Sequence, residues 1–300
     1  MNPPSGHLDE ARLALHFGGR RLVVATAHGK ERILGPILEE ALGVKISVPT
    51  DFDTDAFGTF TGEKTRVGDM LETARAKCLA ALAITGGDLA VASEGAFGPH
   101  PAFPLAMADT ELLLLMDLRN RMEIHALHVT TRTNFQSQIV KSLAALDAFA
   151  AQVGFPNCAL ILRPPEEGNA SEIPSSEDIA KGIFETAALY RAFQERHARW
   201  GAVQVEPDMR AMHNPLRREA IAEVGQRLVQ KLQMICPGCA APGFDVHQVV
   251  RGLPCQSCQW PTASFLSLIY RCPHCQFQLE VKHPDGKTSE DPGLCDRCNP

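Results

Sequence analysis

Eight of the ten cysteines lie in the last 65 residues and form four C-x-x-C pairs. The pairs are Cys236/Cys239, Cys255/Cys258, Cys272/Cys275 and Cys295/Cys298. Two thiolates of one such turn can bind a single metal ion, and two turns complete the tetrahedral Cys₄ set that Zn²⁺ prefers. Fifteen residues separate the first two pairs and nineteen separate the last two, which fits the spacing of known zinc sites. The cysteines therefore predict two zinc ions in a C-terminal module.

The spacing leaves two pairings open. We favour the sequential one, in which the first pair joins the second and the third joins the fourth; a cross-braced arrangement is the alternative. A closed Cys₄ site keeps no open position for water, so both sites are predicted to be structural. The two remaining cysteines, Cys78 and Cys158, lie in apolar segments and are expected to be buried, unreactive thiols.

Composition narrows the class of protein. The formal net charge is −6, and the basic residues are scattered, which argues against a partner bound mainly through nucleic-acid phosphates. No apolar run approaches the roughly 18 residues of a membrane-spanning helix. The N-terminal segment MNPPSGHLDEARL lacks the features of a secretion signal. We therefore expect a cytoplasmic protein without a membrane partner; the sequence does not predict its oligomeric state.

The chain before the cysteines alternates strand-like and helix-like segments. Apolar runs at 21–26, 45–49 and 89–93 read as strands, and 111–118 with 122–130 as a hairpin turning at 119–121. Helices are predicted at about 64–84, 134–152 and 179–200, and after Asn214, a helix cap with Pro215 at the first helical position. This order predicts an α/β fold with a mixed central sheet flanked by helices. We divide the chain into an N-terminal extension (1–20), an α/β domain (21–233) and a double Cys₄ zinc-ribbon domain (234–300).

Charged residues gather where these predicted strands end. Lys30 begins a helix directly after the first strand, where backbone N–H groups and the helix dipole favour an anion. Arg66 and Lys77 lie on one flank of the next helix, and Glu94 ends the strand LAVAS. Ligands of open α/β sheets bind outside the carboxyl ends of strands, so an acid there is a candidate Mg²⁺ ligand or general base. The segment EPDMRAMHNPLRR, again after a strand, adds four further candidates: Asp208, Arg210, His213 and Arg217.

The order TAHGK, FGTFTGEKTR…ETARAK and SEG resembles the inosine/xanthosine triphosphate pyrophosphatase superfamily and its Maf-like relatives. Those proteins begin with strand–T-x-N-x-x-K–helix and place an acid before Gly after a later strand. The resemblance implies that Lys30 and Lys77 bind phosphate and that Glu63 or Glu72, with Glu94, binds Mg²⁺. HNPLRR is similar to the superfamily's late S-H-R motif, which implies that His213 and Arg217 contact base or phosphate.

The chain departs from the superfamily at two places and is similar to another family as a whole. His28 replaces the usual Asn, and Ser93-Glu94-Gly95 replaces D-D-S-G. The segments ATAHGKE, SEGAFGPHP, EPDMRAMHNPLR and the ending CDRCNP resemble an uncharacterised bacterial family with a C-terminal zinc ribbon.

Two hypotheses follow. The first is a Mg²⁺-dependent nucleoside triphosphate pyrophosphatase-like hydrolase of acid anhydrides, with Glu63, Glu72 and Glu94 as catalytic residues. Its expected binding residues are Thr26, His28, Lys30, Arg66, Lys77, Asp208, Arg210, His213 and Arg217. The second is a non-catalytic adaptor that holds a nucleotide or phosphorylated small molecule and uses its zinc ribbons to bind protein or nucleic acid.

Overall fold

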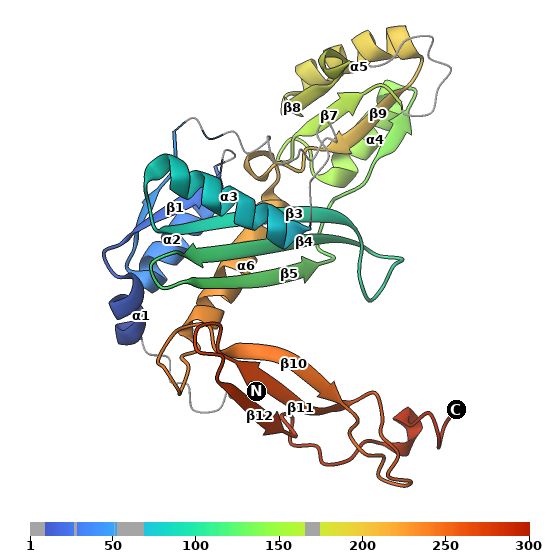
Figure 1. Cartoon of the computed structure of the whole chain (residues 1–300). Coiled ribbons are helices and arrows are strands. Elements are labelled where there is room, and N and C mark those ends of the chain that lie inside the picture. Colours follow the sequence, from blue (N-terminus) through green and yellow to red (C-terminus); the bar gives the residue numbers. More distant parts are fainter. Residues whose placement is uncertain (1–9, 27–28, 51, 53–68, 166–174) are drawn as a thin grey trace.

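The computed structural model describes residues 10–26, 29–50, 52, 69–165 and 175–300 (Figure 1). Within them the chain is mixed α/β, as the sequence predicts, and its strands form three separate sheets. The three sheets are formed one after another along the chain. The last long helix, α6, nevertheless packs against the first sheet (Figure 1).

The first sheet has the strand order β2-β1-β3-β4-β5. Its strands are β1 (Arg21–Ala25), β2 (Lys45–Ser47), β3 (Leu89–Pro99), β4 (Met107–Asp117) and β5 (Met122–Thr130). Strand β1 runs parallel to both β2 and β3, whereas β3, β4 and β5 are antiparallel to one another. The predicted hairpin is therefore confirmed as β4 and β5. Because Ala25 pairs with Ala92, strand β1 ends beside the middle of the longer β3.

Helices cover both faces of this sheet. Helices α1 (Glu10–Phe17), α2 (Glu31–Leu42) and α6 (Pro215–Gln233) pack on one face, and α3 (Met70–Thr85) packs on the other. Side chains alternate between faces along each strand. Leu113 accordingly belongs to the core under α6, while its neighbours Leu112 and Leu114 belong to the core under α3. We call these the α6 face and the α3 face.

Helices α6 and α3 each begin directly after a residue whose side chain caps the helix. Asn214 accepts hydrogen bonds from the N–H groups of Leu216 and Arg217, and Pro215 is the first residue of α6, as expected from the sequence. Helix α3 begins at Met70 rather than near residue 64, because Asp69 caps it in a reciprocal capping box with Glu72.

The N-terminal segment contributes to the hydrophobic core of the α/β domain that contains the first sheet. Leu13 and Phe17 of α1 are fully buried in the cluster under α6, within the range that the sequence assigned to an extension. These two side chains bury apolar area that stabilises the first sheet.

A second sheet, which the sequence did not separate from the first, has the order β6-β9-β7-β8 and its own core. Its elements are β6 (Gln138–Val140), α4 (Leu143–Val153), β7 (Leu160–Arg163), β8 (Ala180–Ile183), α5 (Thr186–Trp200) and β9 (Val203–Pro207). The helix predicted at 134–152 starts only at Leu143, because Ser142 caps it. The helix predicted at 179–200 starts at Thr186, because Gly182 has φ +69° and belongs to β8.

The third sheet is the antiparallel C-terminal ribbon of β10 (Asp245–Arg251), β11 (Phe265–Arg271) and β12 (Gln278–Lys282). Met122 of β5 packs into the apolar cluster of the ribbon with Phe244 and Tyr270. This contact joins the ribbon to the edge of the first sheet.

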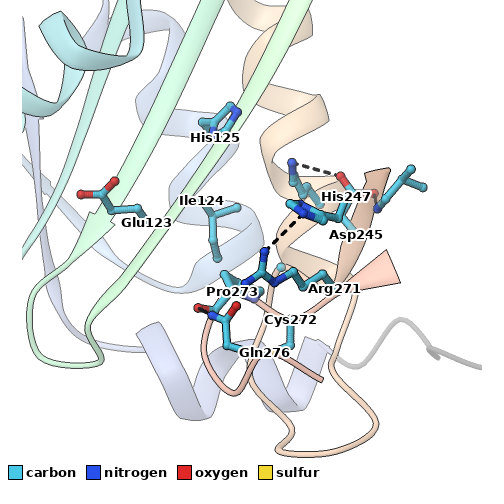
Figure 2. A pocket seen from close by; sticks show the side chains of 12 residues that line it. Glu123, Ile124, His125, Asp245, His247, Arg271, Cys272, Pro273 and Gln276 are labelled. Atoms are coloured by element: carbon cyan, nitrogen blue, oxygen red, sulfur yellow. Dashed lines mark hydrogen bonds and ion pairs between the residues drawn. The ribbon is translucent and has the colours of Figure 1, made fainter. Parts of the chain in front are cut away.

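A cleft of about 310 Å³ lies where the ribbon meets β5 and the end of α6 (Figure 2). Lys231 and Asp245 form an ion pair with 3.1 Å between Nζ and Oδ2. Arg271 and His247, both labelled in Figure 2, are joined by a hydrogen bond of 3.2 Å. The ion pair joins the ribbon to α6, and the hydrogen bond links β10 to β11 within the ribbon. No helix in the described part of the chain is both long and apolar enough to cross a membrane.

Candidate functional site

The eight cysteines of the ribbon form two compact clusters. One contains Cys236, Cys239, Cys272 and Cys275; the other contains Cys255, Cys258, Cys295 and Cys298. Sulfur atoms from facing pairs lie 3.7 to 3.8 Å apart. A tetrahedron with Zn–S bonds of about 2.3 Å has edges of about 3.8 Å. The sulfur spacing and the all-thiol donor set therefore fit two zinc ions.

The pairing is cross-braced, and the sequential pairing that we favoured from the sequence is wrong. The reason is the antiparallel sheet. Asp245 at the start of β10 pairs with Arg271 at the end of β11, so the first and third cysteine pairs meet at one end of the ribbon. At the other end, Cys255 and Glu290 form a bridge that brings the fourth pair to the second.

Three of the four turns share one backbone conformation. Ala240, Gln259 and Gln276 each follow the second cysteine of a pair and have φ near +60°. In each turn, the N–H of that residue donates to the carbonyl of the first cysteine. Backbone N–H groups also donate to sulfur, from Gly238 to Cys236 Sγ, for example. Such donors stabilise thiolates; the N–H of Phe277, together with hydrogen bonds from the neighbouring thiols, lowers the pKa of the Cys275 thiol to about 7.

In the body, charged side chains meet where β1 ends beside β3. On the α6 face, Lys30 Nζ donates to Ser93 Oγ across 2.7 Å. One step along the same face, Arg217 Nε donates to Glu111 Oε1 across 2.8 Å. Arg217 also donates to the carbonyl of Met209. These contacts join the start of α2, strands β3 and β4, and the start of α6.

Glycine at position 95 makes room for this arrangement. In the register of β3 and β4, Gly95 lies opposite Glu111. A Cβ at Gly95 would lie 2.6 Å from both Arg217 Nη2 and Glu111 Oε1. The Arg217 guanidinium continues over the Phe97 ring, with 5.3 Å between the guanidinium carbon and the ring centroid. The pair therefore packs directly against the backbone of β3.

On the α3 face, a second ion pair lies near the same place, where β1 ends beside β3. Lys77 of α3 contacts Glu94 of β3 through Nζ and Oε1, and both residues are buried. Lys30 interacts electrostatically with this pair as well as with Arg217 and Glu111. Residues 30, 77, 94 and 217, which the sequence singled out separately, are thus brought together.

Burial perturbs two groups of this cluster. Desolvation, reinforced by the charge of Arg217, lowers the pKa of Lys30 to about 8. Desolvation and the neighbouring Glu111 raise the pKa of Asp109 to about 7, although Arg217 and Lys30 oppose this shift. Perturbed groups of this kind are concentrated at functional sites.

Sequence reasoning did not select Ser93, Asp109 or Glu111. Asp109 and Glu111 precede the apolar run of β4 and point to the same face as the buried Leu113. The available signal was this alternation, which places two acids in line with a core residue.

The other predicted site residues have different settings. Thr26 is buried just after β1. Glu72 is exposed, and its carboxylate accepts the N–H of Asp69 in the helix cap. His28, Glu63 and Arg66 lie outside the described residues.

Asp208, Arg210 and His213 form a separate group beside β8. The fully buried Asp208 accepts hydrogen bonds from the Gly182 N–H and from Arg210, whose Nη2 lies 2.6 Å away. The His213 ring contacts the Phe184 ring edge-on, and burial lowers the pKa of His213. This group adjoins the second sheet, and Arg217 joins it to the first through Met209.

Fold and clusters together define a mixed α/β protein with a cross-braced ribbon that carries two zinc-type Cys₄ clusters. The chain belongs to the family described as "Domain of unknown function (DUF6671)", which matches residues 77–300. The match includes residues 77, 94, 111 and 217 as well as all eight ribbon cysteines. No curated protein matches the chain.

Proposed function

We propose that the α/β body is a Mg²⁺-dependent hydrolase of nucleoside triphosphates, with an activity like that of the inosine/xanthosine triphosphate pyrophosphatases. One observation carries this proposal. Lys30, Lys77, Glu94 and Arg217, from four separate stretches of chain, are buried and lie within electrostatic range of Lys30, where β1 ends beside the parallel strand β3. Open α/β sheets bind ligands outside the carboxyl ends of their strands, and the carboxyl end of β1 lies here.

The charge inventory supports an anionic ligand. Three cations, Lys30, Lys77 and Arg217, are at most 8 % exposed, and burying such groups costs free energy even when they are paired. A phosphate placed among them would gain charge-assisted hydrogen bonds from donors that are already ordered. In this role the three cations would neutralise the charge that develops on the phosphoryl oxygens.

The residues at this edge fit a magnesium ion. Glu94, Asp109 and Glu111 supply buried carboxylates, and Asp109 Oδ1 and Glu111 Oε2 have no hydrogen-bond partner among the described residues. Oxygen donors of this kind suit hard divalent cations. A bound Mg²⁺ would supply charge neutralisation and a more acidic water.

Asp208, Arg210 and His213, beside β8, are proposed to bind the remaining part of the nucleotide. On the resemblance to the pyrophosphatases, His213 contacts base or phosphate, and we extend this role to Asp208 and Arg210. Their position next to Met209, whose carbonyl accepts from Arg217, supports a ligand that reaches from the first sheet to the second.

A phosphate-release screen tests the proposal. The zinc-loaded full chain is incubated with Mg²⁺ and a panel of nucleoside triphosphates, and phosphate and pyrophosphate are measured. We expect release with at least one substrate, a loss of at least about tenfold in Glu94→Gln, and none in the control Glu123→Gln. Glu123 is half-exposed and paired with Arg75, away from the cluster. Absence of release from every substrate would refute the hydrolase.

Exposed aromatic side chains on the ribbon favour the second candidate, an adaptor. Trp260 is 50 % exposed with Arg297 stacked on it, and Phe265 is 40 % exposed with Arg251 stacked on it. Aromatic and Arg side chains are enriched in binding interfaces. The adaptor predicts that nucleotides raise the melting temperature without being hydrolysed, and that Trp260→Ala weakens capture of a partner by the ribbon while leaving the melting temperature unchanged.

A further inference from the structure

Asp109 and Glu111 occupy a distinct place in the cluster. They are two residues apart on β4, so both side chains point to the α6 face. Across the ladder they lie opposite Phe97 and Gly95 of β3. Asp109 is 1 % exposed and Glu111 is 0 % exposed, which makes them a pair of fully buried acids on one strand.

Each of the two carboxylates keeps one unused oxygen. Glu111 Oε1 accepts from Arg217 Nε, but Glu111 Oε2 has no hydrogen-bond partner in the part of the chain that the structure describes. The same is true of Asp109 Oδ1. A buried polar atom left without a partner destabilises the folded state, and more so when it is charged. Two such atoms on neighbouring buried acids are available as ligands for a bound cation, although the charges of Lys30 and Arg217 lie nearby.

Arg217 donates no hydrogen bond to either of these two oxygen atoms. Its Nε is used by Glu111 Oε1, and its Nη1 is used by the Met209 carbonyl. The guanidinium also lies over the Phe97 ring and against the backbone at Gly95, and its charge acts on Asp109 without a hydrogen bond to Asp109 Oδ1.

We propose that Asp109 and Glu111 together bind a divalent, oxygen-preferring cation, Mg²⁺ or Mn²⁺, on the α6 face of the first sheet. Mg²⁺ is commonly held by one or two carboxylates, with phosphate oxygens and waters as its other ligands. A phosphate held by Lys30 and Arg217 would complete the set here. The inference rests on the proposed function for this phosphate, but metal binding by the acid pair can be measured without any reaction.

This site differs from the one that the sequence suggested. Glu94 points to the α3 face, where Lys77 is bound to its carboxylate. A cation at Glu94 would have to displace Lys77, whereas Asp109 Oδ1 and Glu111 Oε2 need no displacement. The α6 face is therefore the better-suited side of the sheet for the metal.

Direct binding of Mn²⁺ tests the proposal. Zinc-loaded full-length protein is titrated with Mn²⁺ and the free ion is followed by electron paramagnetic resonance, with and without inorganic phosphate. We expect Asp109→Asn to weaken Mn²⁺ binding at least about tenfold and the control Glu123→Gln to leave it unchanged. Binding by Asp109→Asn equal to that of the wild type, or no binding by the wild type under either condition, would overturn the proposal.

Asp109→Asn is the deciding variant because it removes like-charge repulsion and is expected to fold. Its melting temperature without Mn²⁺ should equal or exceed that of the wild type; Asp109→Ser replaces it if circular dichroism shows a loss of structure. The outcome is independent of hydrolysis. Mn²⁺ binding lost in Asp109→Asn supports the site even when no nucleotide is cleaved. Nucleotide cleavage with unchanged Mn²⁺ binding in Asp109→Asn overturns the site and leaves the hydrolase standing.

Discussion

Arg217 at the start of α6 donates from Nε to Glu111 Oε1 on β4 across 2.8 Å, and the two side chains are 1 % and 0 % exposed. The residues are 106 positions apart in the chain. Their pair fixes the start of α6 over the first sheet. The other end of α6 leads directly into Ile235 and Cys236, which belong to the core of the body and to the first zinc-type cluster, respectively. One helix thus links the buried charged cluster to the ribbon.

Replacing only one partner of the Arg217–Glu111 pair should destabilise the protein more than replacing both. Arg217→Met leaves Glu111 buried without its cation and is expected to lower the free energy of unfolding by about 3–5 kcal/mol. Adding Glu111→Leu should recover part of the loss, because apolar replacements of a buried pair are often tolerated. Urea denaturation of the wild type, both single variants and the double variant measures the coupling. A double variant as unstable as the sum of the singles would contradict it.

Gly95 and Gly98 offer a matched pair on β3. A Cβ at Gly95 would lie 2.6 Å from Arg217 Nη2 and Glu111 Oε1, whereas a Cβ at Gly98 meets no atom within 4 Å. Gly95→Ala is therefore expected to lower the free energy of unfolding by about 1–3 kcal/mol through overpacking. Gly98→Ala should be neutral or slightly stabilising. Thermal unfolding of both variants tests this expectation, and equal effects would show that the close approach at Gly95 is unimportant.

Zinc content can distinguish the two pairings. Metal analysis of the full chain should find two zinc ions. Replacing Cys236 and Cys275 together by Ser should remove one ion, because both cysteines belong to the same cluster. Replacing Cys236 and Cys258 together should remove both ions, although in sequential pairing these two would share one site. If the Cys236/Cys275 variant lost both ions and the Cys236/Cys258 variant lost only one, the sequential pairing would be correct.

The pH dependence of stability should report the burial of Lys30. Its pKa is lowered from 10.5 in the unfolded chain to about 8 in the folded protein, so the folded state binds fewer protons between these values. The cost of burying the charge is fully present below pH 8 and disappears as the pH rises toward 10.5. This shift amounts to roughly 3 kcal/mol.

Two variants isolate this effect. The difference in unfolding free energy between wild type and Lys30→Met should change in favour of the wild type between pH 8 and pH 10. Lys45 is exposed, so the same comparison with Lys45→Met should show no trend. Denaturant titrations at pH 7, 8, 9 and 10 provide the measurement, and parallel curves for wild type and Lys30→Met would contradict the burial effect.

The cluster in the body was partly predictable from the sequence. Lys30 follows β1, and a residue that follows a buried strand lies at the carboxyl end of that strand whatever the remaining fold. Glu94 was expected to end its strand, but it lies within β3, which continues to Pro99. Lys77 and Arg217 lie on helices, and only packing against Glu94 and Glu111 decided that they belong to the same edge. Asp109 and Glu111 resembled ordinary polar residues at the start of a hairpin, because the neighbouring sequence does not indicate that α6 covers the face of the sheet to which they point.

The sequence by itself determined the ligands of the ribbon. A C-x-x-C turn is a local structure, so eight cysteines in four pairs already specify the thiols and the number of ions. It could not determine which pairs share an ion, because each turn can complete a site with any other. Tertiary structure decided this. The antiparallel register of Asp245 with Arg271 places the first turn beside the third, and the bridge of Cys255 with Glu290 places the second beside the fourth.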